Sequence, residues 1–402
     1  MPDAATEAST RITRRAGPLR VGLLGGFGIG NFGNDASLEA MLRFMREERP
    51  DAELTCICSN PDRVRDRFAI PAIPTVIAPR GPLGTINKLL LRVPGAIASW
   101  IYTLSVLSRF DVIIVAGTGV FDDFRDTPFG WPSRTLRWSL ASRLRGVRYA
   151  YVSVGAGPLV NPVSRWLMKQ AAKLAAYRSY RDDDSHRFMK SIGVDDPRDS
   201  VLPDLAFLLP HKPEAPRAPG PLTIGVGVMT YAGWHESEQG YTSYLDLHER
   251  LIRWIEGQGH TVKAVIGQTP ADLKAIDALE ARLGKPLLIE KERAMSSIHD
   301  AMDAIAETDF VIASRYHVQI AALKMRRPLI SLGYGPKNDA LMQAAGLDGF
   351  IHNVDATDFD ALTQQVETIA ADRARYVAIV DERVSAMERE LRQALQKLDF
   401  LS

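Results

Sequence analysis

The sequence predicts an α/β protein built from two Rossmann-like, doubly wound domains that face each other across a cleft. Short, nearly continuous apolar runs rich in β-branched residues alternate with amphipathic segments along most of the chain. The alternation stops at a proline-rich segment and then starts again. The length of 402 residues suits two domains of about 150–200 residues each.

In the first half, apolar runs alternate with helical patterns, and this order favours a parallel sheet with helices on both faces. Strands are expected at residues 20–27, 52–59, 111–117 and 147–156, with helices at 35–48, 134–145 and 163–176. A short strand at 176–182 and a helix at 183–194 follow, and residues 200–208 close this half.

The second half begins after residues 209–221, which hold five prolines and are typical of a stiff linker. Strands are then expected at 222–229, 261–267, 286–290, 309–314 and 327–334, with a helix at 241–258. From 357 onward, the sequence predicts helices with one apolar stripe, whose members recur every three or four residues: Val377, Val380, Val384, Met387, Leu391 and Leu395. The expected organisation is therefore a disordered tail at 1–18, domains at 19–208 and 222–356, and C-terminal helices at 357–402.

The balance of charge and the two cysteines exclude some classes of function. The 49 basic and 48 acidic residues cancel, so bulk charge gives no reason to expect a nucleic-acid partner. Cys56 and Cys58 lie in an expected strand and are predicted to be buried thiols, with an adjacent disulfide or a two-ligand metal site as the alternative. No metal centre is expected, and the polar residues 1–18 do not read as a signal peptide, so we expect a cytoplasmic protein.

The longest uncharged stretch, 93–108, is shorter than the ~20 residues that a membrane span needs, and it contains Pro94. It predicts a buried helix. The alternative is a helix that lies on the inner face of a membrane, with Trp100 and Tyr102 at the interface.

The first expected strand runs into a glycine-rich loop, residues 25–37, directly before a helix. Such a loop lets backbone amides approach a ligand, and the start of the helix offers free N–H groups to an anion. Ser59 and Asn60 occupy the place where a nicotinamide-binding fold carries an acidic residue, so nicotinamide binding is disfavoured. The loop is predicted to bind a ligand, and the alternative is that Asn34 or Asp35 simply caps the helix.

Further polar side chains follow other strands. Gly117, Asp122 and Asp123 follow the strand at 111–117, and the carboxylates could hold a sugar hydroxyl or cap the next turn. Arg181 follows the strand that begins at 176 and could offer a planar fork to a phosphate or carboxylate, or pair with the neighbouring aspartates.

The most informative segment is 314–338. Arg315 and His317 follow the strand at 309–314 and open the next helix, and Lys337 follows the strand after that. An arginine can fix an anionic substrate near a positive helix end, and a histidine can move a proton near neutral pH. The alternative for His317 is a cap or a core residue.

Five of these motifs, taken in order, resemble the polysaccharide pyruvyltransferase family. They are GNFGNDASLEAML, AGTGVFDD, YRDDDSHRFMKSIGV, LPDLAF and SRYHVQIAALKMRRPLISLGYGPK, and they cover residues from about 20 to 347. The two-domain architecture is similar to that of GT-B glycosyltransferases. The sequence departs from the family pattern at Asn34 and Asp35, where Asp-Glu is usual, and at Thr118, which interrupts a glycine run.

The resemblance implies phosphoenolpyruvate as donor substrate and no cofactor. It implies that Arg181, Arg315, His317 and Lys337 bind the donor, with Arg315 and His317 in catalysis and His317 favoured for proton transfer. The acceptor or cleft loop would comprise Asn31, Gly33, Asn34, Asp35, Gly117, Asp122 and Asp123.

The expected activity is transfer of a pyruvyl group to a sugar of a surface polysaccharide or of its lipid-linked precursor. The expected partners are therefore phosphoenolpyruvate and a glycan or lipid-linked oligosaccharide, with contact to the membrane surface as a further option. Two alternatives remain: a GT-B glycosyltransferase that uses a nucleotide sugar, and a non-catalytic member that only binds glycans.

Overall fold

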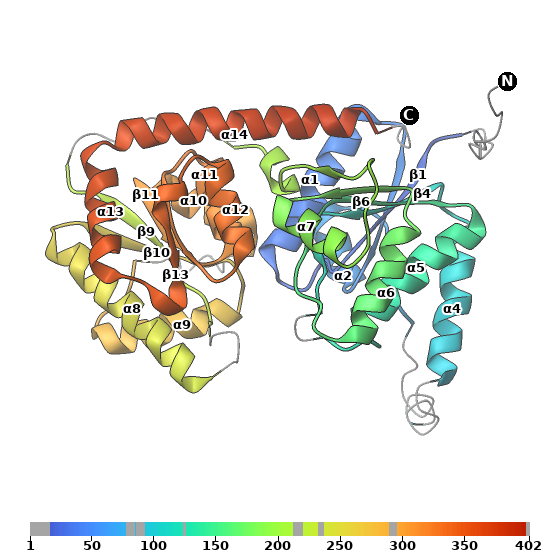
Figure 1. Cartoon of the computed structure of the whole chain (residues 1–402), viewed down its shortest axis with the longest axis horizontal. Helices are drawn as coiled ribbons and strands as arrows, with labels where there is room; N and C mark the ends of the chain where they lie inside the picture. Colours follow the sequence, from blue (N-terminus) through green and yellow to red (C-terminus); the bar gives the residue numbers. More distant parts are fainter. Residues whose placement is uncertain are drawn as a thin grey trace.

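The computed structural model describes residues 17–77, 85, 93–123, 126–211, 220–231, 237–288 and 296–398. Within these residues two parallel sheets lie side by side, each flanked by helices (Figure 1). Most of the expected tail and most of the proline-rich linker, residues 1–16 and 212–219, fall outside the described residues. The predicted α/β class with two Rossmann-like domains is confirmed.

The N-terminal sheet has the strand order β3-β2-β1-β4-β6-β7-β8, with β5 paired to β6, and its pairs are parallel. The order changes direction between β1 and β4, which makes their carboxyl ends the switch point of this sheet. The strands are β1 (Arg20–Gly25), β2 (Glu53–Cys58), β3 (Ala72–Pro74), β4 (Val112–Ala116), β5 (Gly119–Phe121), β6 (Arg148–Ala156), β7 (Tyr177–Tyr180) and β8 (Ser200–Val201).

Helices cover both faces of this sheet and form two separate apolar clusters. Phe32 and Met41 of α1 belong to one cluster, whereas Trp138 of α5 and Met168 of α6 belong to the other. The helical elements of this domain are α1 (Phe32–Glu48), α2 (Pro61–Phe68), α4 (Val93–Leu107), α5 (Trp131–Arg145), α6 (Pro162–Lys173), α7 (Asp183–Ser191) and the 3-10 turn η1 (Leu205–Leu208).

The C-terminal sheet has the parallel order β10-β9-β11-β12-β13, and its switch point lies between β9 and β11. Its strands are β9 (Thr223–Gly227), β10 (Thr261–Val265), β11 (Phe310–Ala313), β12 (Leu329–Gly333) and β13 (Ile351–Asn353). Its helices are α8 (Glu238–Gly257), α9 (Ala271–Leu283), α10 (Ile298–Ala306), α11 (Tyr316–Lys324), α12 (Pro336–Ala344) and α13 (Phe359–Ala371), with 3-10 turns η2 (Asp348–Phe350) and η3 (Val354–Ala356). The strand expected at 286–290 is wrong over its described part, where Leu288 makes only a single bridge to Lys263.

The last helix, α14 (Arg373–Gln396), runs from the C-terminal domain to the N-terminal domain, where it ends above α1 (Figure 1). The predicted apolar stripe is confirmed from Val380 to Leu395, whose members are buried, whereas Val377 is half-buried. Beyond the stripe, Gln396 donates a hydrogen bond of 2.8 Å to Glu48 of α1. Lys324 of α11 donates both to Glu388 of α14 at 2.6 Å and to the backbone oxygen of Phe207 in η1 at 2.7 Å, so α14 joins the two domains.

Two expectations about the N-terminal domain can be compared with the structure directly. Cys56 and Cys58 are buried free thiols, as predicted.

The prediction of a buried helix at 93–108 is wrong for one face of that helix: α4 buries Ser99 and Thr103 but leaves Ile97 and Ile101 exposed. In the part of the chain that the structure describes, no helix is both long and apolar enough to span a membrane.

Candidate active site

The switch points of the two sheets meet at one place between the domains. The glycine-rich loop after β1 leads into α1, and its residue Asn31 forms an antiparallel bridge with Gln268, which follows β10. Arg315 and His317 follow β11 at the other switch point. Because ligands of doubly wound folds bind outside the carboxyl ends of strands at such points, these loops define the candidate site.

His317 lies in the first turn of α11, and its ring contacts the N-terminal domain at Gly33. A Cβ built at Gly33 would lie 2.0 Å from Nδ1 of the ring, so only glycine fits there. Nε2 is buried and has no hydrogen-bond partner among the described residues. Burial, together with the positive charges of Arg181, Lys337 and Arg315, lowers the pKa of His317 well below its usual value. The imidazole is therefore neutral in the unliganded protein.

Arg181 follows β7, and its side chain is largely buried in the site. Its guanidinium lies over the ring of Tyr316, with Cζ 4.6 Å from the ring centroid, and it packs against Gly155, where a Cβ would lie 2.6 Å from Cζ. Its Nε lies 3.5 Å from Asp182 and its Nη1 lies 3.8 Å from Asp204. Burial lowers the pKa of Arg181, but the surrounding Tyr316 and aspartates raise it more, so the charge is fixed.

Arg315 is held by the loop between β10 and α9. Its guanidinium forms an ion pair with the fully buried Asp272 and donates from Nη1 to Oε1 of Gln268 at 3.2 Å. Asp272 in turn accepts a hydrogen bond of 3.1 Å from the backbone N–H of Gly267. The stem of Arg315 lies against Gly267, where a Cβ would be 2.2 Å from Cδ. The side chain is thus held at its guanidinium by Asp272 and Gln268, and along its stem by Gly267.

Lys337 lies in the first turn of α12 and completes the group of cations. Its ammonium is 4.7 Å from the ring centroid of Tyr334 and 5.9 Å from that of Tyr316. Burial raises the pKa of Tyr334, but Lys337, Arg315 and Arg181 lower it more, so the net shift is downward. The structure therefore gathers all four predicted donor residues around Tyr316 and His317.

Buried polar atoms without a hydrogen-bond partner are concentrated at this site. Leaving such an atom unsatisfied costs about 1–3 kcal/mol, so each one points to a missing partner. A polar ligand could supply these hydrogen bonds. The atoms without a hydrogen-bond partner include Nε of Arg181, Oδ2 of Asp182, Oδ2 of Asp204, Nε of Arg315, Nε2 of His317 and Oδ1 of Asn338.

Within the described residues, no three His, Cys, Asp or Glu side chains converge as metal ligands would.

The polar side chains of the predicted acceptor loop are used inside the N-terminal domain. Asn31 caps α1 through the backbone N–H groups of Gly33 and Asn34, and Asn34 donates to the backbone oxygen of Gly26 at 3.1 Å. Asp35 is buried and accepts a hydrogen bond of 2.8 Å from the backbone N–H of Gly28, and burial raises its pKa. The carboxylate of Asp35 thus holds the loop in shape, and a role of this loop toward an acceptor stays a prediction.

The residues after β4 divide between structure and site. Gly117 is buried with a φ of 61°, and a Cβ there would lie 2.5 Å from Oγ of Ser37, so it serves packing and not acceptor contact. Asp123 accepts hydrogen bonds from the backbone N–H groups of Val160 and Asn161 at 3.0 and 2.8 Å, so it holds the loop before α6 and does not cap the next turn. Asp122 lies near Arg181 and contributes to raising the pKa of that guanidinium.

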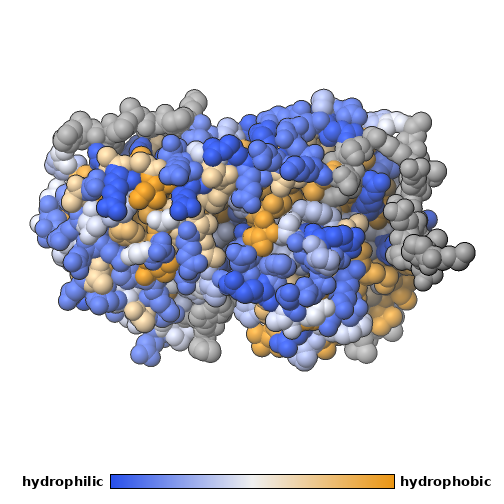
Figure 2. Space-filling view, turned by 45° about the horizontal axis from the view of Figure 1, so that its top comes forward, coloured by the Kyte–Doolittle hydropathy of each residue, from blue (hydrophilic) through white to orange (hydrophobic). Residues whose placement is uncertain are grey.

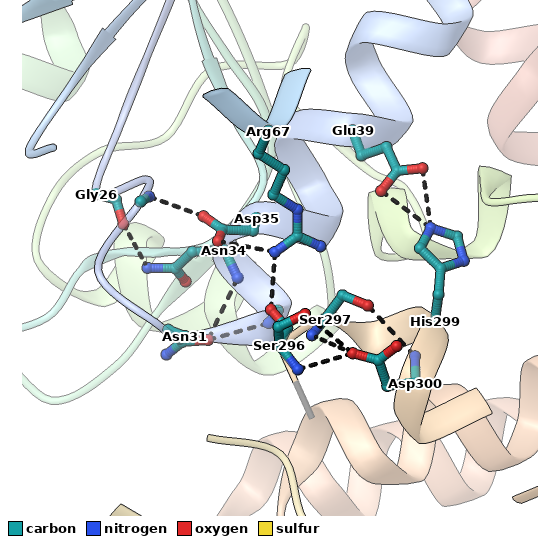
Figure 3. A network of polar contacts seen from close by, with 12 residues as sticks. Gly26, Asn31, Asn34, Asp35, Glu39, Arg67, Ser296, Ser297, His299 and Asp300 are labelled. Atoms are coloured by element: carbon teal, nitrogen blue, oxygen red, sulfur yellow. Dashed lines mark hydrogen bonds and ion pairs between the residues drawn. The ribbon is translucent and has the colours of Figure 1, made fainter. Parts of the chain in front are cut away.

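Polar contacts hold the two domains together beside the glycine-rich loop (Figure 3). Arg67 lies 3.5 Å from Asp35 and donates to the backbone oxygen of Ser296 at 2.8 Å. Glu39 of α1 pairs with Nε2 of His299 of α10 at 2.9 Å. Burial raises the pKa of Glu39, but His299 and Arg43 lower it more, so the carboxylate stays charged near neutral pH. These contacts fix the glycine-rich loop relative to the C-terminal domain.

Sequence reasoning missed three residues that orient the cations. Tyr316 stands between the two predicted residues of α11 and supplies the surface on which Arg181 lies. Asp204 lies in LPDLAF, a motif that carried the family resemblance, so a signal for it was present. Asp272 carried no such signal, because its only link to the site is the ion pair that the fold creates.

Solved structures of other proteins share this fold at low sequence identity. UDP-GlcNAc 2-epimerase from Neisseria meningitidis, bound to UDP-GlcNAc, is 12% identical, with a TM-score of 0.60 over 94% of this chain and 99% of that one. The Methanocaldococcus jannaschii UDP-GlcNAc 2-epimerase is 11% identical, with a TM-score of 0.57 over 87% and 92%. An Anabaena protein in complex with UDP-glucose is 13% identical, with a TM-score of 0.55 over 94% and 100%. At these identities the likeness shows the GT-B fold alone.

No curated protein matches this sequence. The family model described as polysaccharide pyruvyl transferase matches residues 31–336, from the N-cap of α1 to the first residue of α12. The matched span includes Gly33, Arg181, Arg315 and His317, the residues that meet at the site. The chain therefore belongs to the polysaccharide pyruvyl transferase family.

Proposed function

We propose that this protein transfers the pyruvyl group of phosphoenolpyruvate to two hydroxyls of one sugar, which forms a cyclic ketal and releases phosphate. The observation that carries the proposal is the position of His317 among Arg181, Arg315 and Lys337. Membership of the family supports pyruvyl transfer as the chemistry. The acceptor sugar belongs to a surface polysaccharide or to its lipid-linked precursor.

The three cations suit a donor that carries both a carboxylate and a phosphate. Arg181 and Arg315 present planar forks that can bind such groups in a bidentate manner, and Lys337 adds a compact charge. Both guanidiniums are already immobilised, by Tyr316 and Asp272 respectively. Little conformational entropy is therefore lost when the donor binds.

The donor also changes the protonation of His317. In the unliganded protein burial, together with the three cations, lowers the pKa of this imidazole and keeps it neutral. The negative charges of bound phosphoenolpyruvate offset those cations, so the pKa of His317 rises and the ring takes up a proton. It then holds that proton close to the bound donor.

The chemical steps follow from this arrangement. His317 gives its proton to the methylene carbon, which becomes a methyl group, and the adjacent carbon becomes electrophilic. One sugar hydroxyl adds to that carbon, the bond from that carbon to the phosphate oxygen breaks, and a second hydroxyl closes the ketal. Of the two hydroxyl protons, one restores His317 and the other leaves with phosphate, so atoms and charges balance.

The test follows isotope-labelled phosphoenolpyruvate incubated with glycan and lipid-linked oligosaccharide fractions from the source cells. We expect label to enter the glycan as phosphate is released in equal amount. His317→Asn should lower this rate by about 10²–10⁴-fold while calorimetry still detects donor binding. His260→Asn, which changes a histidine at the opposite edge of the C-terminal sheet, is the matched control and should leave the rate unchanged.

Two other results would overturn the proposal. Transfer of sugar from labelled UDP-sugars, without use of phosphoenolpyruvate, would identify a GT-B glycosyltransferase. Glycan binding without phosphate release in any fraction would identify a binding protein. Wild-type turnover by His317→Asn would remove this residue from the proposed role.

A further inference from the structure

Helix α4 carries apolar side chains on two sides. On the inner side Val106 and Leu107 are buried, together with the small or polar Gly95, Ser99 and Thr103. The buried Arg137 of α5 donates to Oγ1 of Thr103 at 3.1 Å. The opposite side carries Val93, Ile97 and Ile101, which are 55%, 57% and 64% exposed. A second, outward-facing apolar stripe on a helix that already packs into the core indicates an apolar partner.

The same face of the domain exposes further apolar side chains at the start of α6. Val163 and Trp166 lie in the first turns of α6 and are 52% and 57% exposed, and Val160 directly precedes the helix. Because α4, α5 and α6 connect parallel strands, their amino-terminal ends lie at one edge of the domain. Figure 2 shows hydrophobic residues gathered along the lower margin of the N-terminal domain.

The charges on these three helices all have one sign. Neither α4, α5 nor α6 contains an aspartate or glutamate, although the whole chain has nearly equal numbers of acidic and basic residues. Of the basic residues, Arg143, Arg145 and Lys173 are exposed near the carboxyl ends of α5 and α6. The basic residues of the three helices are Arg134, Arg137, Arg143, Arg145, Arg165, Lys169 and Lys173.

We propose that the face formed by α4, α5 and α6 docks on a bilayer that contains anionic lipids. The apolar stripe of α4 and the start of α6 insert among the headgroups and upper acyl chains, as interfacial helices do. The basic residues of α5 and α6 then meet the anionic headgroups, and the absence of carboxylates on the three helices removes repulsion. Complementary charge is the reason to choose a lipid surface over an apolar protein partner.

The residues that make this contact differ from those expected from the sequence. Trp100 and Tyr102 pack partly into the second apolar cluster, and the hydroxyl of Tyr102 donates to the backbone oxygen of Pro74 at 2.9 Å. They face the domain, whereas Ile97 and Ile101 face outward. The docking face is therefore defined by Val93, Ile97, Ile101, Val163 and Trp166.

This orientation has a consequence that rests on the proposed function. The amino-terminal ends of α4 and α6 lie at the same edge of the sheet as the carboxyl ends of β1 and β4, where the candidate site begins. The exposed basic residues lie at the other ends of α5 and α6, so the helical face and not this edge alone lies on the bilayer. One end of the docked face is then the edge at which the site begins. We expect the acceptor to be a lipid-linked oligosaccharide rather than a finished, released polymer.

The test is co-sedimentation of the full chain with vesicles, without donor or acceptor, so it is independent of the proposed reaction. Wild type should sediment with phosphatidylglycerol–phosphatidylcholine vesicles and much less with phosphatidylcholine alone. The double variant Ile97→Ser, Ile101→Ser should lower the partition coefficient at least about tenfold, as should Trp166→Ser. Arg143→Gln with Arg145→Gln should weaken binding to the anionic vesicles only.

Leu288→Ser is the matched control, because Leu288 is 56% exposed but lies in the C-terminal domain. It should bind vesicles as wild type does, and all variants should keep the wild-type Tm because the replaced side chains are exposed. The proposal is overturned if wild type stays in the supernatant with both kinds of vesicle, or if the serine variants bind unchanged. It is equally overturned if light scattering shows that wild type is a dimer and that the double variant Ile97→Ser, Ile101→Ser is a monomer. A second copy of the chain would then cover this face.

Discussion

His317 and Gly33 come from different domains, and a Cβ built at position 33 would lie 2.0 Å from Nδ1 of the imidazole. The same relationship recurs at Gly155, where a Cβ would lie 2.6 Å from Cζ of Arg181, and at Gly267, where it would lie 2.2 Å from Cδ of Arg315. Each of these three side chains thus packs directly against the backbone of a glycine. Any larger residue at these positions would push the side chain away, so the glycines determine where the three side chains lie.

Gly33→Ala should therefore displace His317 without unfolding the protein. The added methyl group cannot coexist with the ring, so either the ring or the domain must move. We expect the rate of phosphate release to fall at least about 100-fold, because small misplacements of a catalytic group have effects of this size. Gly257→Ala is the control, since nothing lies within 4 Å of a Cβ at that helical position. A near-normal rate for Gly33→Ala would show that the ring need not lie where it does.

Asp272→Asn should weaken donor binding by releasing Arg315. Asp272 is fully buried and forms the ion pair that orients this guanidinium. Calorimetry should show a loss of donor affinity of about tenfold or more, together with a lower Tm because a buried charge is left unpaired. Combined with Arg315→Lys, the two losses should be less than additive, since both act on the same group. Asp246→Asn removes the partner of Arg282 at an exposed site and is the control. Additive losses would contradict the positioning role.

The stability of the fold should fall in mild acid because of His248. This histidine is buried in α8, donates from Nδ1 to the backbone oxygen of Tyr244 at 2.8 Å, and burial lowers its pKa to about 4. Between pH 6.5 and 4 the unfolded chain binds this proton and the folded chain does not, so stability is lost as pH falls through that window, by up to roughly 3 kcal/mol. Urea unfolding of His248→Phe at pH 7 and pH 5 should show a smaller loss than wild type. An equal loss in both proteins would place the acid sensitivity elsewhere.

Leu391→Ala should destabilise the protein through the helix that joins the domains. Leu391 is fully buried in α14, and removing a buried leucine side chain costs about 2–5 kcal/mol in unfolding free energy. Chemical denaturation should report a loss in that range. Arg389→Ala changes an exposed residue of the same helix and should leave the midpoint almost unchanged. An unchanged midpoint for Leu391→Ala would mean that α14 packs more loosely than its burial indicates.

Much of the site was predictable because its residues follow strands. Arg181 and Arg315 come directly after a short apolar run and before a helix, and Lys337 lies in the first turn of the helix after such a run. The sequence displays this local pattern. What could not be predicted is the contact between domains. The position of His317 on Gly33, and the pairing of Arg315 with Asp272, depend on how separate loops meet in space and leave no periodic signal.

The orientation of α4 was unpredictable for a different reason. Its sequence is uncharged on all sides, so periodicity alone does not say which stripe faces inward. The buried side includes Thr103, which accepts a hydrogen bond from the buried Arg137; this guanidinium also donates to the backbone oxygen of Thr75 at 2.9 Å. A tertiary hydrogen bond thus outweighed the hydrophobic preference of Ile97 and Ile101.

Helix α14 also sets the order in which this molecule can be completed during synthesis. It packs against η1 and reaches α1, yet it follows every strand of both sheets along the chain. A nascent chain that ends before Arg373 can form both domains but lacks the helix that bridges them. The contacts of α14 with the N-terminal domain are therefore the last of the interdomain contacts to form during synthesis, after the residues that pair Glu39 with His299 have been made.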